Sequence, residues 1–262
     1  MSWNVYPFFA FIAILCWLGA GLLLVVNKKR WVVSIISLGI IVYGAFIICL
    51  WSALERPPFR TMGETRLWYA FFLSLTGLLI YLIWRYRWIP VCTGIIASVF
   101  ALVNVLKPEI HSTTLMPALQ SPWFIPHVSV YILSYAMLGI ATITAVTQLF
   151  KISKQKEDEH LYLMIDNIMY IGFAFLIFGL ISGAIWAKEA WGHYWSWDPK
   201  ETWAFITAVA FLICIHLRLQ ERFNKITLWL IPFSFALLMV TWIGVNYLPS
   251  AQSSVHVYSK QN

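Results

Sequence analysis

Eight stretches of this chain contain no Asp, Glu, Lys or Arg, and they limit what it can fold into. They are residues 6–26, 31–54, 67–84, 88–106, 128–150, 167–187, 202–217 and 226–247. Most are long enough to cross a bilayer core, which takes roughly 20 helical residues. Only helices satisfy the backbone at that depth, because no water is present there. We therefore predict an all-α polytopic membrane protein, a bundle of about eight transmembrane helices.

The composition supports this class. Hydrophobic residues make up 61% of the chain and charged residues 11%, against roughly 25% charged in an ordinary soluble domain. We expect a single integral membrane domain over residues 1–262, with four helices in 1–114, and a first helix that is retained rather than cleaved. The cysteines sit in apolar runs without ligand spacing, so we expect neither a disulfide framework nor a zinc site.

The basic residues predict an orientation. Eleven lie in one set of connections: Lys28, Lys29, Arg30, Arg85, Arg87, Lys151, Lys154, Lys156, Arg218, Arg222 and Lys225. Seven lie in the other: Arg56, Arg60, Arg66, Lys107, Lys188, Lys200 and Lys260. The first set sits in short loops against helix ends, which marks the cytoplasmic side. Eight crossings then place both termini outside. The net charge of +7 follows from this topology and does not indicate nucleic-acid binding.

Residues 186–203, from the end of the sixth run to the start of the seventh, hold five tryptophans. These are Trp186, Trp191, Trp195, Trp197 and Trp203. One reading is the aromatic belt found at any membrane interface. The other, which we favour at this density, is an interfacial platform whose rings stack on a ligand.

The end of this segment reads as a helix start. Asp198-Pro199-Lys200-Glu201 places Asp at the N-cap, Pro at the first helical position and Glu at the third. Such a pair forms a capping box, in which each side chain bonds the other residue's amide. We expect the seventh helix to begin at Pro199, and we keep ligand contact by Asp198 and Glu201 as the alternative.

Three histidines have informative positions. His127 lies at the outer end of the fifth run and His256 beyond the eighth, on the side of the tryptophans. Two imidazoles at similar depth can bind one metal from opposite faces, and with a planar macrocycle that metal is haem iron. His216 lies inside the seventh run, where ionisable groups are costly and often functional. The alternative is that it only reaches toward the interface. His160 is expected to be a solvated surface residue.

A family resemblance rests on two motifs. Residues 191–203 resemble the WWD signature of haem-handling proteins. Residues 116–123, followed by His127 and by Ser134-Tyr135-Ala136, resemble the CcsA (ResC) branch of system II cytochrome c biogenesis. The resemblance covers about residues 115–258, the expected assembly core, whereas the first four runs match only in hydropathy and number.

The resemblance implies a function. His127 and His256 would ligate haem iron at an outer site, and His216 would hold haem within the membrane. The five tryptophans, with Asp198, would form the platform. Haem b, the transported substrate, would be presented to the Cys-x-x-Cys-His motif of apocytochrome c. A CcsB (ResB) type membrane protein would be the partner, with thiol-reducing proteins also possible. Haem lyase activity would belong only to that complex.

The resemblance also implies a location, and the sequence departs from the family pattern in two places. The membrane would be a bacterial inner membrane or a thylakoid, with the haem site on the outer side. No second intramembrane histidine pairs with His216, so an inner haem site needs another subunit. Position 193 is a histidine where a small or variable residue is expected, and we interpret His193 as a polar loop residue. Propionates would pair with outer basic residues: Arg56, Arg60, Arg66, Lys188 or Lys200.

Other function classes remain as alternatives. A system I haem-delivery protein of CcmC type shares a shorter WWD core, but it usually has six spans. A membrane electron-transfer cytochrome usually places two histidines on facing helices. A transporter without haem would use the tryptophans only as an interface belt. No nucleotide loop, nucleophile dyad or carboxylate pair appears, so any catalysis would consist of orienting haem beside two thiols.

Overall fold

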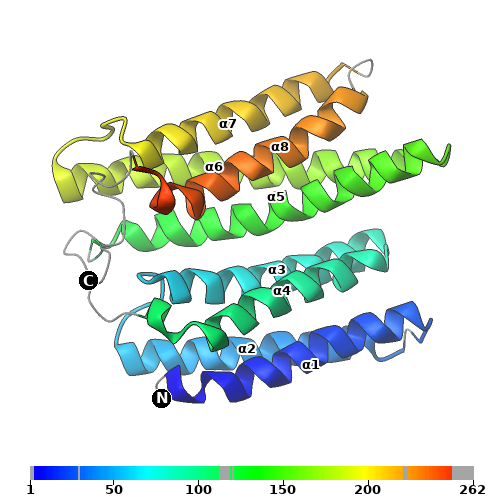
Figure 1. Cartoon of the computed structure of the whole chain (residues 1–262), viewed down its shortest axis with the longest axis horizontal. Coiled ribbons are helices and arrows are strands. Elements are labelled where there is room, and N and C mark those ends of the chain that lie inside the picture. The colour runs from blue at the N-terminus through cyan, green and yellow to red at the C-terminus, as the bar shows by residue number, and fades with distance from the viewer. Residues whose placement is uncertain (1–2, 29, 112–118, 120, 221–223, 250–262) are drawn as a thin grey trace. The chain divides into compact units, whose positions relative to one another are not determined.

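The computed structural model describes residues 3–249 except 29, 112–118, 120 and 221–223. The described chain is helical throughout and contains no strand (Figure 1). Its long helices are α1 (Tyr6–Val25), α2 (Val32–Leu54), α3 (Met62–Trp84), α4 (Trp88–Leu106), α5 (Phe124–Ser153), α6 (Glu159–Trp191), α7 (Pro199–Arg218) and α8 (Asn224–Trp242). Within the described ranges, 8 helices are long and apolar enough to cross a membrane. The predicted fold class is confirmed.

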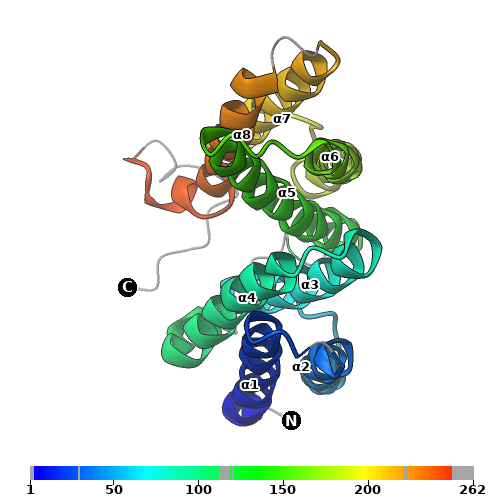
Figure 2. The ribbon, with the colours of Figure 1, turned by 90° about the vertical axis from the view of Figure 1, so that its right-hand side faces the viewer.

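The chain divides into two compact units, residues 1–120 and 121–262. In unit 1, α1 packs on α2 and α4, and α3 packs on α4. In unit 2, α5 packs on α6 and α8, and α7 packs on α8. Figure 2 shows the helices of each unit from their ends. The expected division at residue 114 and the expected single domain both stay predictions.

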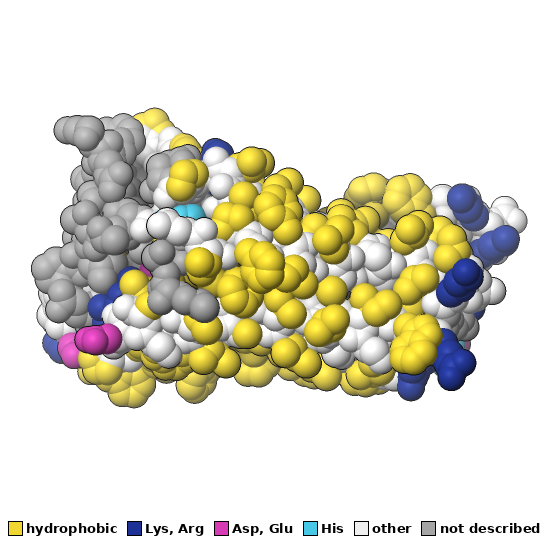
Figure 3. Space-filling model, turned by 90° about the horizontal axis from the view of Figure 1, so that it is seen from below, with side chains coloured by type: hydrophobic (Ala, Val, Ile, Leu, Met, Phe, Trp, Pro, Cys, Tyr) yellow, Lys and Arg dark blue, Asp and Glu magenta, His cyan; other side chains and the backbone are white. Residues whose placement is uncertain are grey.

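Unit 1 shows how such helices pack. Small residues of α1 are fully buried, among them Ala10, Ala13 and Ala20, which lets neighbouring backbones approach closely. Large apolar side chains point outward instead, with Phe8 67% and Leu15 72% exposed. Figure 3 shows apolar side chains along the helices, with a group of Lys and Arg side chains at the right-hand end. This distribution is typical of a surface that faces lipid.

Several helices run past the charge-free stretches. The helix expected over 67–84 begins at Met62, because Thr61 and Glu64 form a capping box that carries charged residues into its first turns. The helices expected over 128–150 and 167–187 span Phe124–Ser153 and Glu159–Trp191. The charge-free runs therefore underestimate the lengths of these helices, because the helix ends reach beyond the bilayer core. By contrast, α8 ends at Trp242, and a short 3-10 helix, η5, follows over Gly244–Tyr247.

The four cysteines are free, as expected. Cys214 is buried, and the other three are half-buried: Cys16, Cys49 and Cys92. They act as small apolar residues in the helix contacts.

Candidate functional site

The tryptophans gather at one end of unit 2, where α5 and α7 begin and α6 and α8 end; we call it the Trp end (Figure 1). The five tryptophans of the expected platform do not share one loop. Trp186 and Trp191 lie on α6, and Trp203 lies half-buried in the first turn of α7. Only Trp195 and Trp197 lie in the connection. Gly192 ends α6 with φ 86°, a left-handed conformation that glycine adopts without a steric penalty.

A buried carboxylate holds this connection in shape. Glu201, 8% exposed, accepts through Oε2 from the Ser196 amide (2.7 Å), the Ser196 hydroxyl (3.2 Å) and the Asp198 amide (3.3 Å). Asp198 Oδ1 in turn accepts from the Glu201 amide at 2.8 Å. The predicted capping box and the predicted start of α7 at Pro199 are both confirmed. Asp198 therefore has a structural role, whether or not it also contacts a ligand.

Trp197 occupies a strained backbone position. Its φ is 58°, in the left-handed region that residues other than glycine seldom adopt. Its carbonyl accepts from the Thr202 hydroxyl at 3.1 Å, and the bonds to Glu201 fix the residues on either side of it. The side chain is 62% exposed. Strain of this kind is found where the surrounding structure holds a residue in place for a function.

His127 has its tautomer set by a hydrogen bond. Its Nδ1 lies 2.8 Å from the carbonyl oxygen of Gly179 on α6. A carbonyl oxygen can only accept, so Nδ1 donates, and the lone pair of the neutral ring lies on Nε2. Carbonyl-bound histidines of this kind are the usual metal-ligating form, because the bond orients the ring and raises its basicity.

Gly183, one helical turn after Gly179, makes room for this imidazole. A Cβ at Gly183 would lie 2.6 Å from both Cε1 and Nδ1 of His127, closer than real contacts allow. The half-buried ring also stacks on Trp186, with centroids 5.5 Å apart and planes 21° apart. Three residues of α6 thus fix one side chain of α5.

Ring contacts continue from His127 in both directions. Trp186 meets Trp191 edge to face at 4.7 Å and also contacts Phe124 at 5.2 Å. On the other side, His127 contacts Tyr131 at 4.8 Å, and Tyr131 contacts Tyr135 at 5.5 Å. Tyr135 reaches Trp242 of α8 at 5.6 Å. This aromatic series connects the end of α6, through α5, to the last residue of α8.

Trp195 and Trp197 belong to a second aromatic group. They meet edge to face at 5.7 Å, and Trp197 contacts Phe205 of α7 at 5.6 Å. The Nε1 atom of Trp195 is shielded from solvent and has no hydrogen-bond partner among the described residues. An unsatisfied buried donor costs about 1–3 kcal/mol, so this N–H is suited to a ligand that brings an acceptor.

His216 lies at the opposite end of unit 2, near the end of α7. It is exposed, and its Nδ1 lies 2.9 Å from the Leu212 carbonyl of its own helix. Nearby, Arg218 binds both carboxylate oxygens of Asp166 at 2.7 Å and lies over the Tyr162 ring at 4.8 Å. The structure thus does not bring His216 and His127 together.

The other histidines lie in different parts of the chain. His256 lies outside the described residues. His193 is exposed after the end of α6, and His160 is exposed in the first turn of α6. His111 belongs to unit 1, where it stacks on Trp3 at 3.7 Å. Within the part of the chain that the structure describes, no group of three His, Cys, Asp or Glu is arranged to hold a metal ion.

The fold and this end together define a class: a multi-pass helical membrane protein with an ordered histidine among tryptophans at the end of its second unit. The family model described as cytochrome C assembly protein matches residues 3–251. Similar proteins include the cytochrome c biogenesis protein CcsA of Mesostigma viride, 31% identical over 86% of this chain and 87% of that protein. CcsA of Chlorella vulgaris is 33% identical over 80% of this chain and 83% of that protein.

The chain therefore belongs to the cytochrome c assembly protein family and is of the CcsA type. The resemblance found in the sequence is confirmed, and with it a role in cytochrome c biogenesis, a process that handles haem. A solved structure titled cytochrome c haem lyase CcmF matches with a TM-score of 0.66 and 18% identity. The match covers 92% of this chain but only 46% of that one. At this identity the likeness concerns the fold alone.

We predict that Glu201→Ala loosens the connection before α7. The Ser196 and Asp198 amides lose their acceptor, so the free energy of unfolding falls by about 1–3 kcal/mol. Thermal unfolding in detergent, followed by tryptophan fluorescence, measures the change. Glu189→Ala is the matched control at the same end, because that exposed carboxylate accepts from the Ser121 hydroxyl and does not bind the amides of this connection. Equal stability of the two variants would contradict the organising role of Glu201.

Proposed function

We propose that this chain binds haem at the Trp end and presents it for attachment to the Cys-x-x-Cys-His motif of an apocytochrome c. His127 and His256 are the proposed axial ligands. The observation that carries the proposal is the hydrogen bond from His127 Nδ1 to the Gly179 carbonyl, which places the ring's lone pair on Nε2. That is the form of histidine that binds haem iron.

The surroundings of His127 fit a flat apolar ligand with acidic groups. Trp186 and Trp191 offer aromatic surface beside the imidazole, and Trp197 offers an exposed ring. The Trp195 N–H needs an acceptor, which a haem propionate carboxylate would supply. Lys188 and Lys200, on the same end, are candidates for the second propionate.

His256 is within reach of this end by chain length. Tyr247 ends η5, which follows α8 at the Trp end. Nine residues of extended chain span at most about 30 Å, so covalent geometry allows His256 to approach the site. A second imidazole from the tail would complete a pair of axial ligands. The histidine of the apocytochrome motif could then replace one of the two and so release haem to its acceptor.

His216 is proposed to serve a second haem position together with a CcsB-type partner. It stands on a face of α7 whose other exposed residues are apolar: Phe205, Ile206, Val209, Leu212 and Ile213. A polar ring on a lipid-exposed face is costly, and a partner helix with its own histidine would relieve that cost. Any haem lyase activity belongs to this complex.

We further propose that the Trp end faces the outer side, since the basic connections at the other end mark the cytoplasmic side.

We predict that His127→Ala and His256→Ala each lower the haem recovered with the chain and the yield of assembled cytochrome c, because each removes an axial ligand. The readout is the Soret spectrum of the chain co-purified with its CcsB-type partner. His160→Ala is the control, because His160 is exposed at the opposite end of unit 2. Unchanged spectra and unchanged cytochrome yield in both ligand variants would refute the proposal and favour a haem-free transporter.

Gly183→Ala tests the geometry without removing a ligand. The new methyl group would displace the His127 ring from the Gly179 carbonyl, so we expect haem affinity to fall about 10- to 100-fold. Gly19→Ala is the control, because a Cβ there meets nothing within 4 Å. Haem titration of both variants, with helicity measured in parallel, decides the outcome. Equal haem affinity of the two folded variants would show that the position of the His127 ring does not matter.

A further inference from the structure

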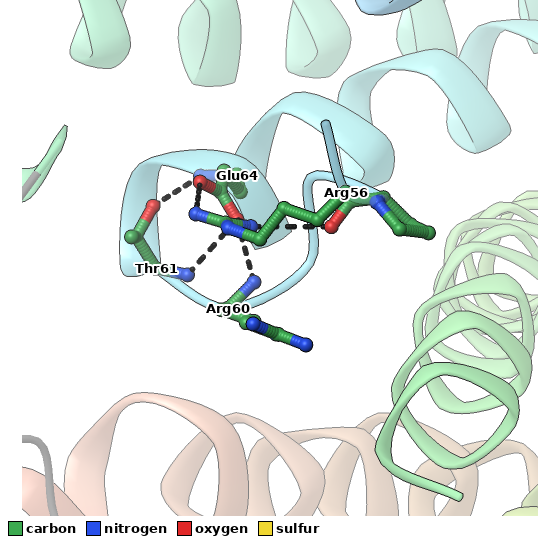
Figure 4. A network of polar contacts seen from close by, with 5 residues as sticks. Arg56, Arg60, Thr61 and Glu64 are labelled. Carbon is green, nitrogen blue, oxygen red and sulfur yellow. Dashed lines mark hydrogen bonds and ion pairs between the residues drawn. The ribbon is translucent and has the colours of Figure 1, made fainter. Parts of the chain in front are cut away.

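A second polar cluster lies in unit 1, on the connection between α2 and α3 (Figure 4). At its centre is Glu64, which is 1% exposed. Glu64 Oε1 accepts from Arg56 Nη2 at 2.8 Å. Glu64 Oε2 accepts from Arg56 Nη1 (3.0 Å), the Arg60 amide (2.6 Å) and the Thr61 amide (3.3 Å). Oε2 thus accepts three of the four bonds and Oε1 accepts one, and all four donors belong to the connection that precedes α3.

The guanidinium of Arg60 is not bound by the Glu64 carboxylate. Only its backbone amide bonds Glu64, and in Figure 4 its side chain points away from the carboxylate. The Arg60 Nε atom is shielded from solvent and has no hydrogen-bond partner among the described residues. Burial, followed by the neighbouring charge of Arg56, lowers the pKa of Arg60, and Glu64 offsets this only in part. A guanidinium nevertheless stays charged, so an added anion would stabilise it.

The connection is rigid, so the position of this cation is defined. Phe59 is 4% exposed and stacks on Trp68 at 4.6 Å with planes 7° apart. Thr61 caps α3 through the Glu64 amide at 3.1 Å. The Asn104 side chain of α4 donates to the Gly63 carbonyl at 2.9 Å, which ties this end of α3 to the end of α4.

The location of Arg60 favours one class of anion. The connection joins two membrane-spanning helices, and Trp51, near the end of α2, is 44% exposed, as interface-level tryptophans are. Lipid phosphates lie at this depth. Arginine binds phosphate through paired N–H donors, a stronger interaction than a neutral hydrogen bond. We propose that Arg60, positioned by the Glu64 cluster, binds the phosphate of an anionic phospholipid at this end of unit 1.

The test compares Arg60→Gln with Lys107→Gln in the full-length chain. Lys107 is an exposed cation at the end of α4, beside the same end of α3, and so it controls for net charge. Each protein is purified in a neutral detergent and titrated with phosphatidylglycerol, and bound lipid is counted by native mass spectrometry. We expect Arg60→Gln to bind phosphatidylglycerol about tenfold more weakly, the effect of one charged hydrogen-bond contact. Lys107→Gln should match the wild type.

Two further ligands test which part of the lipid the site binds. Diacylglycerol with the same acyl chains should bind wild type and Arg60→Gln equally, because it lacks the phosphate. Inorganic phosphate should protect wild type from thermal unfolding far less than phosphatidylglycerol does; equal protection would overturn the lipid as the ligand. Equal phosphatidylglycerol binding by both variants would overturn the site. A loss of haem in Arg60→Gln with unchanged lipid binding would also overturn it, since the guanidinium would then serve haem.

Discussion

In a bilayer, backbone polar groups must be satisfied within the chain, and everything else in this protein follows from that constraint. Helices fill the core, and their polar ends are the only places where loops, charges and ligands can be arranged. Both units respond in the same way. Thr61 with Glu64 and Asp198 with Glu201 form capping boxes in which the glutamate is buried and also binds amides of the preceding connection. Each glutamate thus starts a helix and shapes a candidate site.

The two sites differ in the residues that the capping glutamate holds in place. Glu201 holds Trp197 in a left-handed conformation and exposes its ring, beside the unsatisfied N–H of Trp195. Glu64 fixes the connection that carries Arg60, whose Nε atom has no hydrogen-bond partner among the described residues. The Trp end has a further element, since α6 supplies the Gly179 carbonyl and the space at Gly183 that orient His127. Aromatic surface, a defined imidazole tautomer and a free donor together suit haem, whereas the Arg60 site suits a phosphate.

The sequence predicts where some helices begin, but it does not predict which side chains of different helices meet. The start of α7 at Pro199 was predictable, because Asp198 to Glu201 is a complete capping signature. The same signature, Thr61 to Glu64, marks the start of α3, but a charge-free run can begin only after Arg66 and therefore places that start at residue 67. The family motifs pointed to His127, but its pairing with Gly179 and Gly183 depends on how α5 meets α6. The tryptophans read as one platform yet divide into two groups, because α6 continues to Trp191.

The central claim is that the Nε2 atom of His127 ligates haem iron, and chemical rescue tests it most directly. His127→Gly removes the imidazole and leaves space for one from solution. We expect this variant, purified with its CcsB-type partner, to have a weakened or shifted Soret band that added imidazole restores toward the wild-type spectrum. A His127→Gly spectrum identical to that of the wild type, with no response to imidazole, would contradict it.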